Sequence, residues 1–195
     1  MKTVKLWTRN FRLVILASAI GTLGAIAGGF ALAFLAFDET GSTLASALIV
    51  AIQLLPYLLL PVLIAPFMDR IPRKSFLVAG DAANAILLAG MGMWLLFFDF
   101  SYVGYLAVSL LLACLGAADE LAFTSIYPEL ISEGAEQKGY AVSSMLYPVL
   151  KVIMTPLAAV LLDTIGVAWI LIAQSGLSLA AAVTESCIRL DATER

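Results

Sequence analysis

Five ionisable side chains lie inside long apolar stretches of this sequence, where a charge is costly. They are Asp81, Asp119, Glu120, Lys151 and Glu185. A charged side chain at the centre of a membrane helix costs about 2.5–3.5 kcal/mol on insertion scales, so these residues are candidates for function. Carboxyl and ammonium groups at such depth can exchange protons, pair with one another or bind a charged solute. The chain has no histidine, so imidazole is excluded as a proton shuttle or metal ligand.

The composition places these residues in a membrane protein. Of the 195 residues, 62% are hydrophobic and only 13% are charged, whereas a soluble domain carries about 25% charged residues. This excludes a water-soluble monomer. Cys114 and Cys187 lie alone in apolar runs, without the close spacing of a metal site. We therefore expect no metal and no cofactor.

The elements that position these side chains are apolar runs of about 20 residues, the length of a transmembrane helix. Short connections rich in Asp, Gly, Pro and Ser separate the runs. The sequence predicts an all-α polytopic protein with one domain over 1–195. Its six transmembrane helices are expected at 11–37, 43–67, 75–98, 102–126, 140–162 and 167–188.

The basic residues predict the orientation of these helices, because cytoplasmic connections carry an excess of Lys and Arg. With the N-terminus in the cytoplasm, ten of the eleven basic residues lie on the cytoplasmic side: Lys2, Lys5, Arg9, Arg12, Arg70, Arg73, Lys74, Lys138, Arg189 and Arg195. The outer connections then carry only acids: Asp38, Glu39, Asp99 and Asp163. We predict an N-in, C-in, multi-pass protein of the bacterial cytoplasmic membrane, in contact with lipid.

Two similar segments indicate an internal repeat. Residues 65–72 read APFMDRIP and residues 159–166 read AVLLDTIG, so both follow the pattern A-x-x-x-D-x-I-[PG]. Three predicted helices separate the copies, which places them on opposite sides of the membrane. This predicts a 3+3 inverted repeat, with units at about 11–98 and 102–189, of the kind found in transporters.

The connection after the second predicted helix resembles a loop of the major facilitator superfamily. Residues 65–74 read APFMDRIPRK, and the family pattern is G-x-x-x-D-[RK]-x-G-[RK]-[RK]. Residues 126–130, IYPEL, and Asp81 are similar to stretches of its exporter-like branch, which includes siderophore and macrolide efflux proteins. The chain resembles the N-terminal six-helix half of such a transporter. The resemblance implies a gating loop formed by Asp69, Arg70, Arg73 and Lys74. It also implies a second six-helix half, either a copy of this chain or another chain.

Helical spacing and depth sort the ionisable residues further. Lys151 and Glu120 lie at depths that a long Lys side chain can bridge, so we predict that Lys151 pairs with Glu120 or Asp119. The pair either couples transport to protons or only cancels two insertion penalties. Asp81 and Glu185 lie nearer the cytoplasmic ends, within reach of basic residues there. Further candidates for lining a cavity are Gly24, Gly28, Gln53, Ser144, Tyr147 and Thr155. For the two glycines, close helix packing is the alternative role.

These features predict a secondary transporter, or half of one, that moves a small solute by alternating access, with proton-coupled efflux. The alternative is a non-transporting membrane protein that binds or stabilises another membrane protein. No pattern of a nucleophile with its base, a metal site or a phosphate loop is present, so we do not expect an enzyme. The basic residues are few and already explained by topology, so we expect no nucleic-acid partner.

Overall fold

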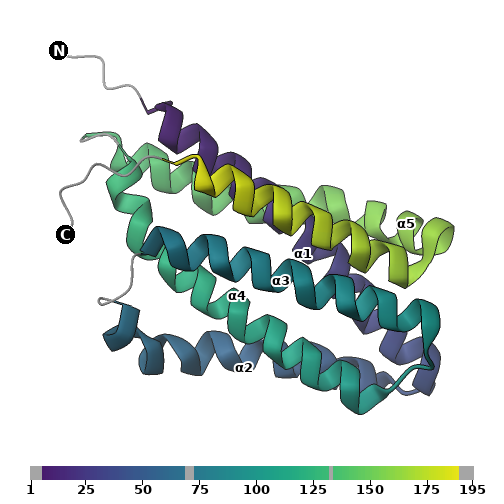
Figure 1. The fold of residues 1–195 in the computed structure, drawn as a ribbon. Helices are drawn as coiled ribbons and strands as arrows, with labels where there is room; N and C mark the ends of the chain where they lie inside the picture. The colour runs from purple at the N-terminus through teal and green to yellow at the C-terminus, as the bar shows by residue number, and fades with distance from the viewer. Residues whose placement is uncertain (1–5, 69–72, 132–133, 189–195) are drawn as a thin grey trace.

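The computed structural model describes residues 6–68, 73–131 and 134–188, without the side chains of residues 65–68, 73 and 129. In these ranges the chain is helical, with short connections. The helices lie side by side in one elongated bundle, and the described chain begins and ends at the same end of it (Figure 1). They are α1 (Arg9–Thr40), α2 (Thr43–Met68), α3 (Arg73–Phe97), α4 (Tyr102–Leu130) and α5 (Glu136–Ser186).

The described residues form five helices where six were predicted, because the fifth and sixth apolar runs are joined in α5, an element of 51 residues with a break inside it. The connection expected at 163–166 is helical except at Gly166, whose φ of 78° and ψ of 169° leave the helical region. Glycine has no Cβ and adopts a positive φ at little cost. One residue therefore reverses the chain, and α5 has two arms, 136–165 and 167–186, that run in opposite directions (Figure 1).

Small residues set how closely the helices approach. A Cβ added to Gly92 of α3 would lie 2.9 Å from the backbone oxygen of Ala168 and 2.8 Å from Cγ1 of Ile172, both in α5. The Ser175 hydroxyl of α5 donates a 2.7 Å hydrogen bond to the carbonyl oxygen of Ala85 in α3. Contacts through glycine and serine are typical of helix pairs in membranes. The second arm of α5 is thereby fixed against α3.

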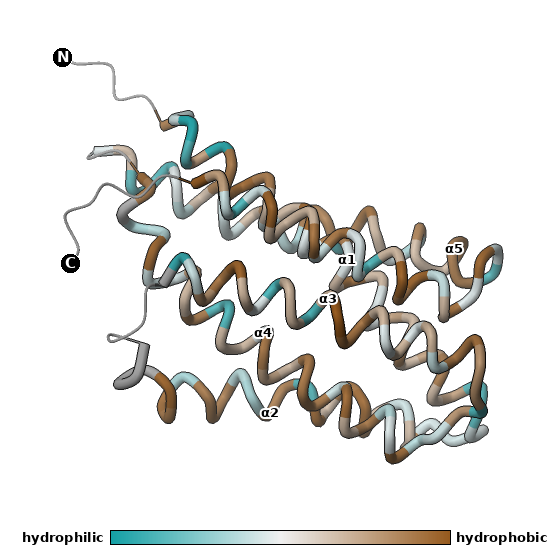
Figure 2. The backbone as a smooth tube through the Cα atoms, viewed as in Figure 1, coloured by the Kyte–Doolittle hydropathy of each residue, from teal (hydrophilic) through white to brown (hydrophobic). Residues whose placement is uncertain are grey.

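The outer surface of the bundle is apolar. Leu58 and Val62 of α2 are 73% and 78% exposed, and Val152 of α5 is 76% exposed. Hydrophobic residues cover most of the length of every helix, and hydrophilic ones gather toward the ends (Figure 2). All five helices are long and apolar enough to cross a membrane. The fold is therefore compatible with an integral membrane protein, as the composition predicts.

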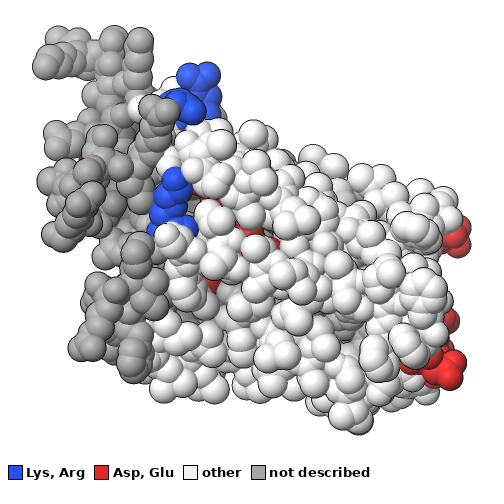
Figure 3. Space-filling model, viewed as in Figure 1, with Lys and Arg blue, Asp and Glu red and all other residues white. Residues whose placement is uncertain are grey.

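Charged residues on the surface separate by sign. In Figure 3 the visible Lys and Arg gather at one end of the bundle and most visible Asp and Glu at the opposite end. We call these the basic end, where α1, α3 and α5 begin, and the acidic end, where α1 ends and α4 begins. A few acidic atoms also show in the middle of the bundle (Figure 3). The separation matches the predicted positive side of a membrane protein, while the N-in orientation and the inverted repeat stay predictions.

Candidate functional site: a carboxyl cluster beside an exposed polar face

Three of the predicted carboxyl groups come together between α3, α4 and the second arm of α5. We call Asp81, Asp119 and Glu185 the carboxyl cluster. Asp119 Oδ1 lies 3.4 Å from the position that a Cβ on Gly80 would take, so it rests on α3 next to Asp81. Asp119 interacts electrostatically with Asp81 and Glu185, and Glu185 interacts with Asp81. Three acids far apart in the sequence thus share one site.

The carboxyl cluster is buried and incompletely paired. Asp81 is 8% exposed and Glu185 is 5% exposed. Asp119 Oδ1 and Glu185 Oε2 are both buried without a hydrogen-bond partner. A buried charge without a partner is strongly unfavourable, and neighbouring carboxylates repel one another. Each carboxyl group of the cluster must therefore take up a proton or pair with a positive charge. Within the described residues, no group of three acidic, Cys or His side chains is arranged to hold a metal ion.

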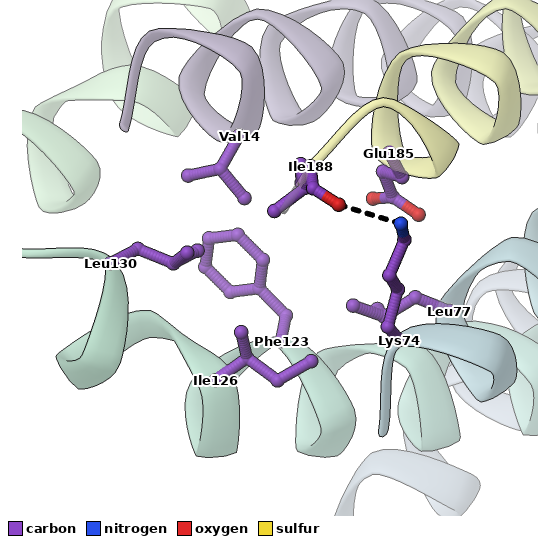
Figure 4. A pocket seen from close by; sticks show the side chains of 8 residues that line it. All are labelled: Val14, Lys74, Leu77, Phe123, Ile126, Leu130, Glu185 and Ile188. Carbon is purple, nitrogen blue, oxygen red and sulfur yellow. Dashed lines mark hydrogen bonds between the residues drawn. The ribbon is translucent and has the colours of Figure 1, made fainter. Parts of the chain in front are cut away.

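Lys74 stands at the edge of the carboxyl cluster, where α5 ends. Its ammonium donates hydrogen bonds to the carbonyl oxygens of Ser186 (2.7 Å) and Ile188 (2.6 Å). A cation is favourable at a helix C-terminus, where carbonyl groups lack helical partners. Figure 4 shows Lys74 and Glu185 together in a narrow pocket whose other lining residues are apolar. Lys74 thus joins the start of α3 to the end of α5.

A second group of polar side chains lies on the outside of the bundle. We call Tyr57, Glu120, Tyr147 and Lys151 the polar face. Tyr57 of α2 interacts electrostatically with Glu120 of α4 and with Tyr147 of α5. The Lys151 ammonium lies 5.3 Å from the centre of the Tyr147 ring, a cation–π distance. All four side chains are exposed, so they form a polar strip on an otherwise apolar surface.

The polar face lies well inside the bundle, nearer its basic end than its acidic end. At a rise of 1.5 Å per residue, Glu120 is about 15 Å from the basic end of α4 at Leu130. Tyr57 is about 16 Å from the end of α2 at Met68, and Tyr147 is about 16 Å from the start of α5 at Glu136. The Lys151 ammonium stands over Tyr147, at the same level. A level about 15 Å from one end of the bundle would lie within a hydrocarbon core about 30 Å thick.

The predicted pairing of Lys151 with Glu120 or Asp119 is not found among the described contacts. Lys151 is exposed and its ammonium faces the Tyr147 ring, whereas Asp119 turns toward α3. The packing explains the difference, because α4 packs mainly on α2 and α3 and α5 packs mainly on α1 and α3. The two helices that carry the predicted pair therefore touch only in places, such as the hydrogen bond from the Tyr127 hydroxyl of α4 to the Gly139 carbonyl oxygen of α5.

The other predicted residues fall into three groups. Asp69 and Arg70 lie outside the described residues, and the side chain of Arg73 is not described, so of the predicted gating loop only Lys74 is placed. Gly24 and Gly28 of α1 face the Gln174 side chain of α5, which is close helix packing. The remaining three candidates are polar residues away from the cluster: Gln53 is half-buried, and the exposed Ser144 and Thr155 donate hydrogen bonds to carbonyl oxygens of their own helix, those of Ala141 and Lys151.

Sequence reasoning missed Tyr57 as a site residue. Its hydroxyl is so close to α4 that a Cβ on Gly116 would lie 2.6 Å from it. One signal was available, since Tyr57 carries the only polar side-chain group in the run 54–64. A lone hydroxyl within an aliphatic membrane helix needs a polar neighbour.

The chain matches no protein-family model, no curated protein and no solved structure. Its function is therefore inferred from the carboxyl cluster and the polar face.

Proposed function

We propose that this chain is a secondary transporter, or half of one, that moves a small solute by alternating access with proton-coupled efflux. The observation that carries the proposal is the polar face. Glu120 and Lys151 are exposed well inside the length of an apolar bundle. Each charge would cost about 2.5–3.5 kcal/mol facing lipid. A face that lines a water-filled path avoids that cost.

The carboxyl groups support coupling to protons. Glu185 lies in the last turn of α5 at the basic end, and Asp81 lies about 12 Å into α3 from the same end. Asp119 follows deeper in the bundle and interacts electrostatically with Glu120 of the polar face. The acids thus extend from the basic end to the polar face. Chains of carboxyl groups are a recurrent form of proton relay in membrane transport. Glu120 is the coupling residue in this proposal, because it is the member exposed to the path.

The segment 65–74 supports the same proposal through its resemblance to the major facilitator superfamily loop. On this proposal the segment 69–74 gates the path at the basic end, which faces the bacterial cytoplasm. Lys74 would transmit the movement, since its hydrogen bonds to Ser186 and Ile188 link α3 to α5. A second half, either a copy of this chain or another chain, would supply the opposite wall of the path.

The proposal is tested in membrane vesicles that contain the purified protein and carry an inside-acid pH gradient. The probe is a defined mixture of small metabolites without amphiphilic amines, which accumulate in acid vesicles without any carrier, and the vesicle contents are read by mass spectrometry against protein-free vesicles. We expect at least one solute to accumulate in wild-type vesicles and to be lost when a protonophore collapses the gradient. Glu120→Gln should abolish gradient-driven accumulation while equilibrium binding of that solute is retained.

The matched control is Asp163→Asn, which removes an exposed acid at the acidic end. It should accumulate the solute as the wild type does. Gradient-driven accumulation that survives in Glu120→Gln would exclude Glu120 as the coupling residue. A wild-type protein that accumulates no solute would instead favour a membrane protein that only binds a partner.

A further inference from the structure

We propose that the polar face binds an uncharged aromatic solute that carries a carbonyl oxygen, with the ring of the solute on Tyr57 and Tyr147 and its oxygen on the Lys151 ammonium. This inference rests on the proposed function and names the chemical class of the solute. It is carried by two exposed aromatic rings and one exposed ammonium group on an otherwise apolar surface.

The two tyrosines of the polar face have no aromatic partner among the described residues. Tyr105, Tyr127 and Tyr140 each pack against another ring, with ring centres 5.1–5.4 Å apart. Tyr57 and Tyr147 form no such pair in this part of the chain, although they are 48% and 52% exposed. Packed aromatic rings gain more stability than their buried area alone provides. Each of these two rings therefore offers a favourable contact to a ring of the solute.

The two rings border the same space from different helices. The Tyr57 hydroxyl of α2 lies so close to α4 that a Cβ on Gly116 would be 2.6 Å from it. Tyr147 lies on the first arm of α5 and interacts electrostatically with Tyr57. Because α2 packs mainly on α4 and α1, and α5 mainly on α1 and α3, the rings belong to different walls of the polar face. A planar solute can contact both from the exposed side.

The Lys151 ammonium supplies the hydrogen-bond donor. An ammonium has three N–H donors, and the contact of this one is the Tyr147 ring, whose centre is 5.3 Å away. Charged donors form stronger hydrogen bonds to oxygen acceptors than neutral donors do. Because the ammonium stands over the Tyr147 ring, a solute ring packed beside Tyr147 brings its carbonyl oxygen within reach of Lys151.

The charge of the polar face favours an uncharged solute. Glu120 and Lys151 give the face one negative and one positive charge, so it has no net charge when Glu120 is ionised. A charged solute would add an uncompensated charge inside the membrane, which is unfavourable. An uncharged solute also leaves Glu120 free to exchange the coupling proton, as the proposed function requires.

The test is equilibrium dialysis of the full chain in lipid nanodiscs against two probes, 2-naphthamide and its saturated analogue decahydro-2-naphthamide. Both probes carry the same carbonyl group, and only the first has aromatic rings. Binding to protein-free nanodiscs is subtracted. We expect the dissociation constant of 2-naphthamide to be at least about fivefold lower than that of the saturated probe, since two ring contacts add to the affinity.

Substitutions at the polar face separate the ring contacts from the hydrogen bond. Tyr57→Leu and Tyr147→Leu should each reduce the preference for 2-naphthamide, whereas Tyr147→Phe, which keeps the ring, should retain it. Lys151→Met should weaken the binding of both probes about tenfold and leave the ratio of their affinities unchanged. Glu120→Gln should bind both probes as the wild type does. So should the matched control Phe97→Leu, at a 70% exposed ring outside the polar face.

Equal affinities of the two probes for the wild type, or no binding of either, would overturn the inference. A preference for 2-naphthamide that survives in both Tyr57→Leu and Tyr147→Leu, or unchanged affinities in Lys151→Met, would do the same. The outcome is separable from the proposed function. Binding of 2-naphthamide without gradient-driven accumulation of any solute keeps this site and refutes transport. Transport of other solutes by a protein that does not distinguish the two probes keeps transport and refutes this site.

Discussion

Gly92→Ala should weaken the contact between α3 and α5 that holds the carboxyl cluster together. The added Cβ would lie 2.9 Å from the backbone oxygen of Ala168 and 2.8 Å from Cγ1 of Ile172. Because a backbone oxygen cannot rotate away, the two helices must move apart. Overpacking a core costs about 1–3 kcal/mol of stability, and we expect about 2–3 kcal/mol here. The intrinsic gain of Ala over Gly in a helix, about 1 kcal/mol, offsets part of it.

Gly90→Ala is the matched control, because a Cβ at Gly90 has nothing within 4 Å. Both variants gain the same helix propensity, so the difference between them isolates overpacking. At 2–4 °C per kcal/mol for a chain of this size, the midpoint of thermal unfolding should be roughly 4–12 °C lower for Gly92→Ala than for Gly90→Ala. The assay is thermal unfolding in detergent. The amount of protein that stays dispersed after heating to each temperature is measured by size exclusion. Equal midpoints would refute the close contact of α3 with α5.

Three further variants test the packing around the site. Gly28→Ala would overlap Gln174 Oε1 and place its Cβ 2.6 Å from Gln174 Cδ. Because the end of that side chain can turn away, the cost should stay below about 1 kcal/mol. Gln174→Ala should remove this cost, and thermal unfolding that shows a larger loss, unchanged by Gln174→Ala, would contradict the contact. Lys74→Met removes the donor to Ser186 and Ile188 and should cost about 1–2 kcal/mol, whereas Lys138→Met, at an exposed residue, should be neutral in the same assay. Tyr127→Phe removes a buried 2.7 Å hydrogen bond to the Gly139 carbonyl oxygen and should cost about 1 kcal/mol. Tyr140→Phe is its control, and equal effects of the two would contradict the hydrogen bond.

The all-helical fold was predictable because each of the helices α1 to α4, and each arm of α5, corresponds to one continuous apolar run. Four of the six predicted runs correspond to separate helices, with ends shifted by a few residues. The connection at 163–166 was predicted as a loop from Asp163 and Gly166, since a chain reversal usually needs several residues. The positive φ of Gly166 makes the reversal in one residue, and no periodicity in the sequence encodes that angle.

The candidate site was predictable in its members and not in its grouping. The cost of charge in an apolar run singles out Asp81, Asp119, Glu120, Lys151 and Glu185 without any structure. Depth along a helix suggested a partner for Lys151, but contact also depends on which helices are neighbours. The placement of α3 between α4 and α5 brings Asp119 to Asp81 and Glu185 and leaves Glu120 on the outer face. That arrangement depends on packing between distant segments, which a single sequence does not specify.

The central claim is that the polar face lines a water-filled path inside the membrane. The most direct test is to label Tyr57→Cys and Leu58→Cys with a membrane-impermeant thiol reagent. Both variants are made in a chain with Cys114→Ala and Cys187→Ala and are reconstituted in lipid vesicles. Tyr57 is 48% exposed and its neighbour Leu58 is 73% exposed, so exposure in the isolated bundle favours labelling at Leu58. The account predicts the reverse, with rapid labelling at Tyr57→Cys in water and none at Leu58→Cys in lipid. Labelling at neither residue, or faster labelling at Leu58→Cys, would contradict it.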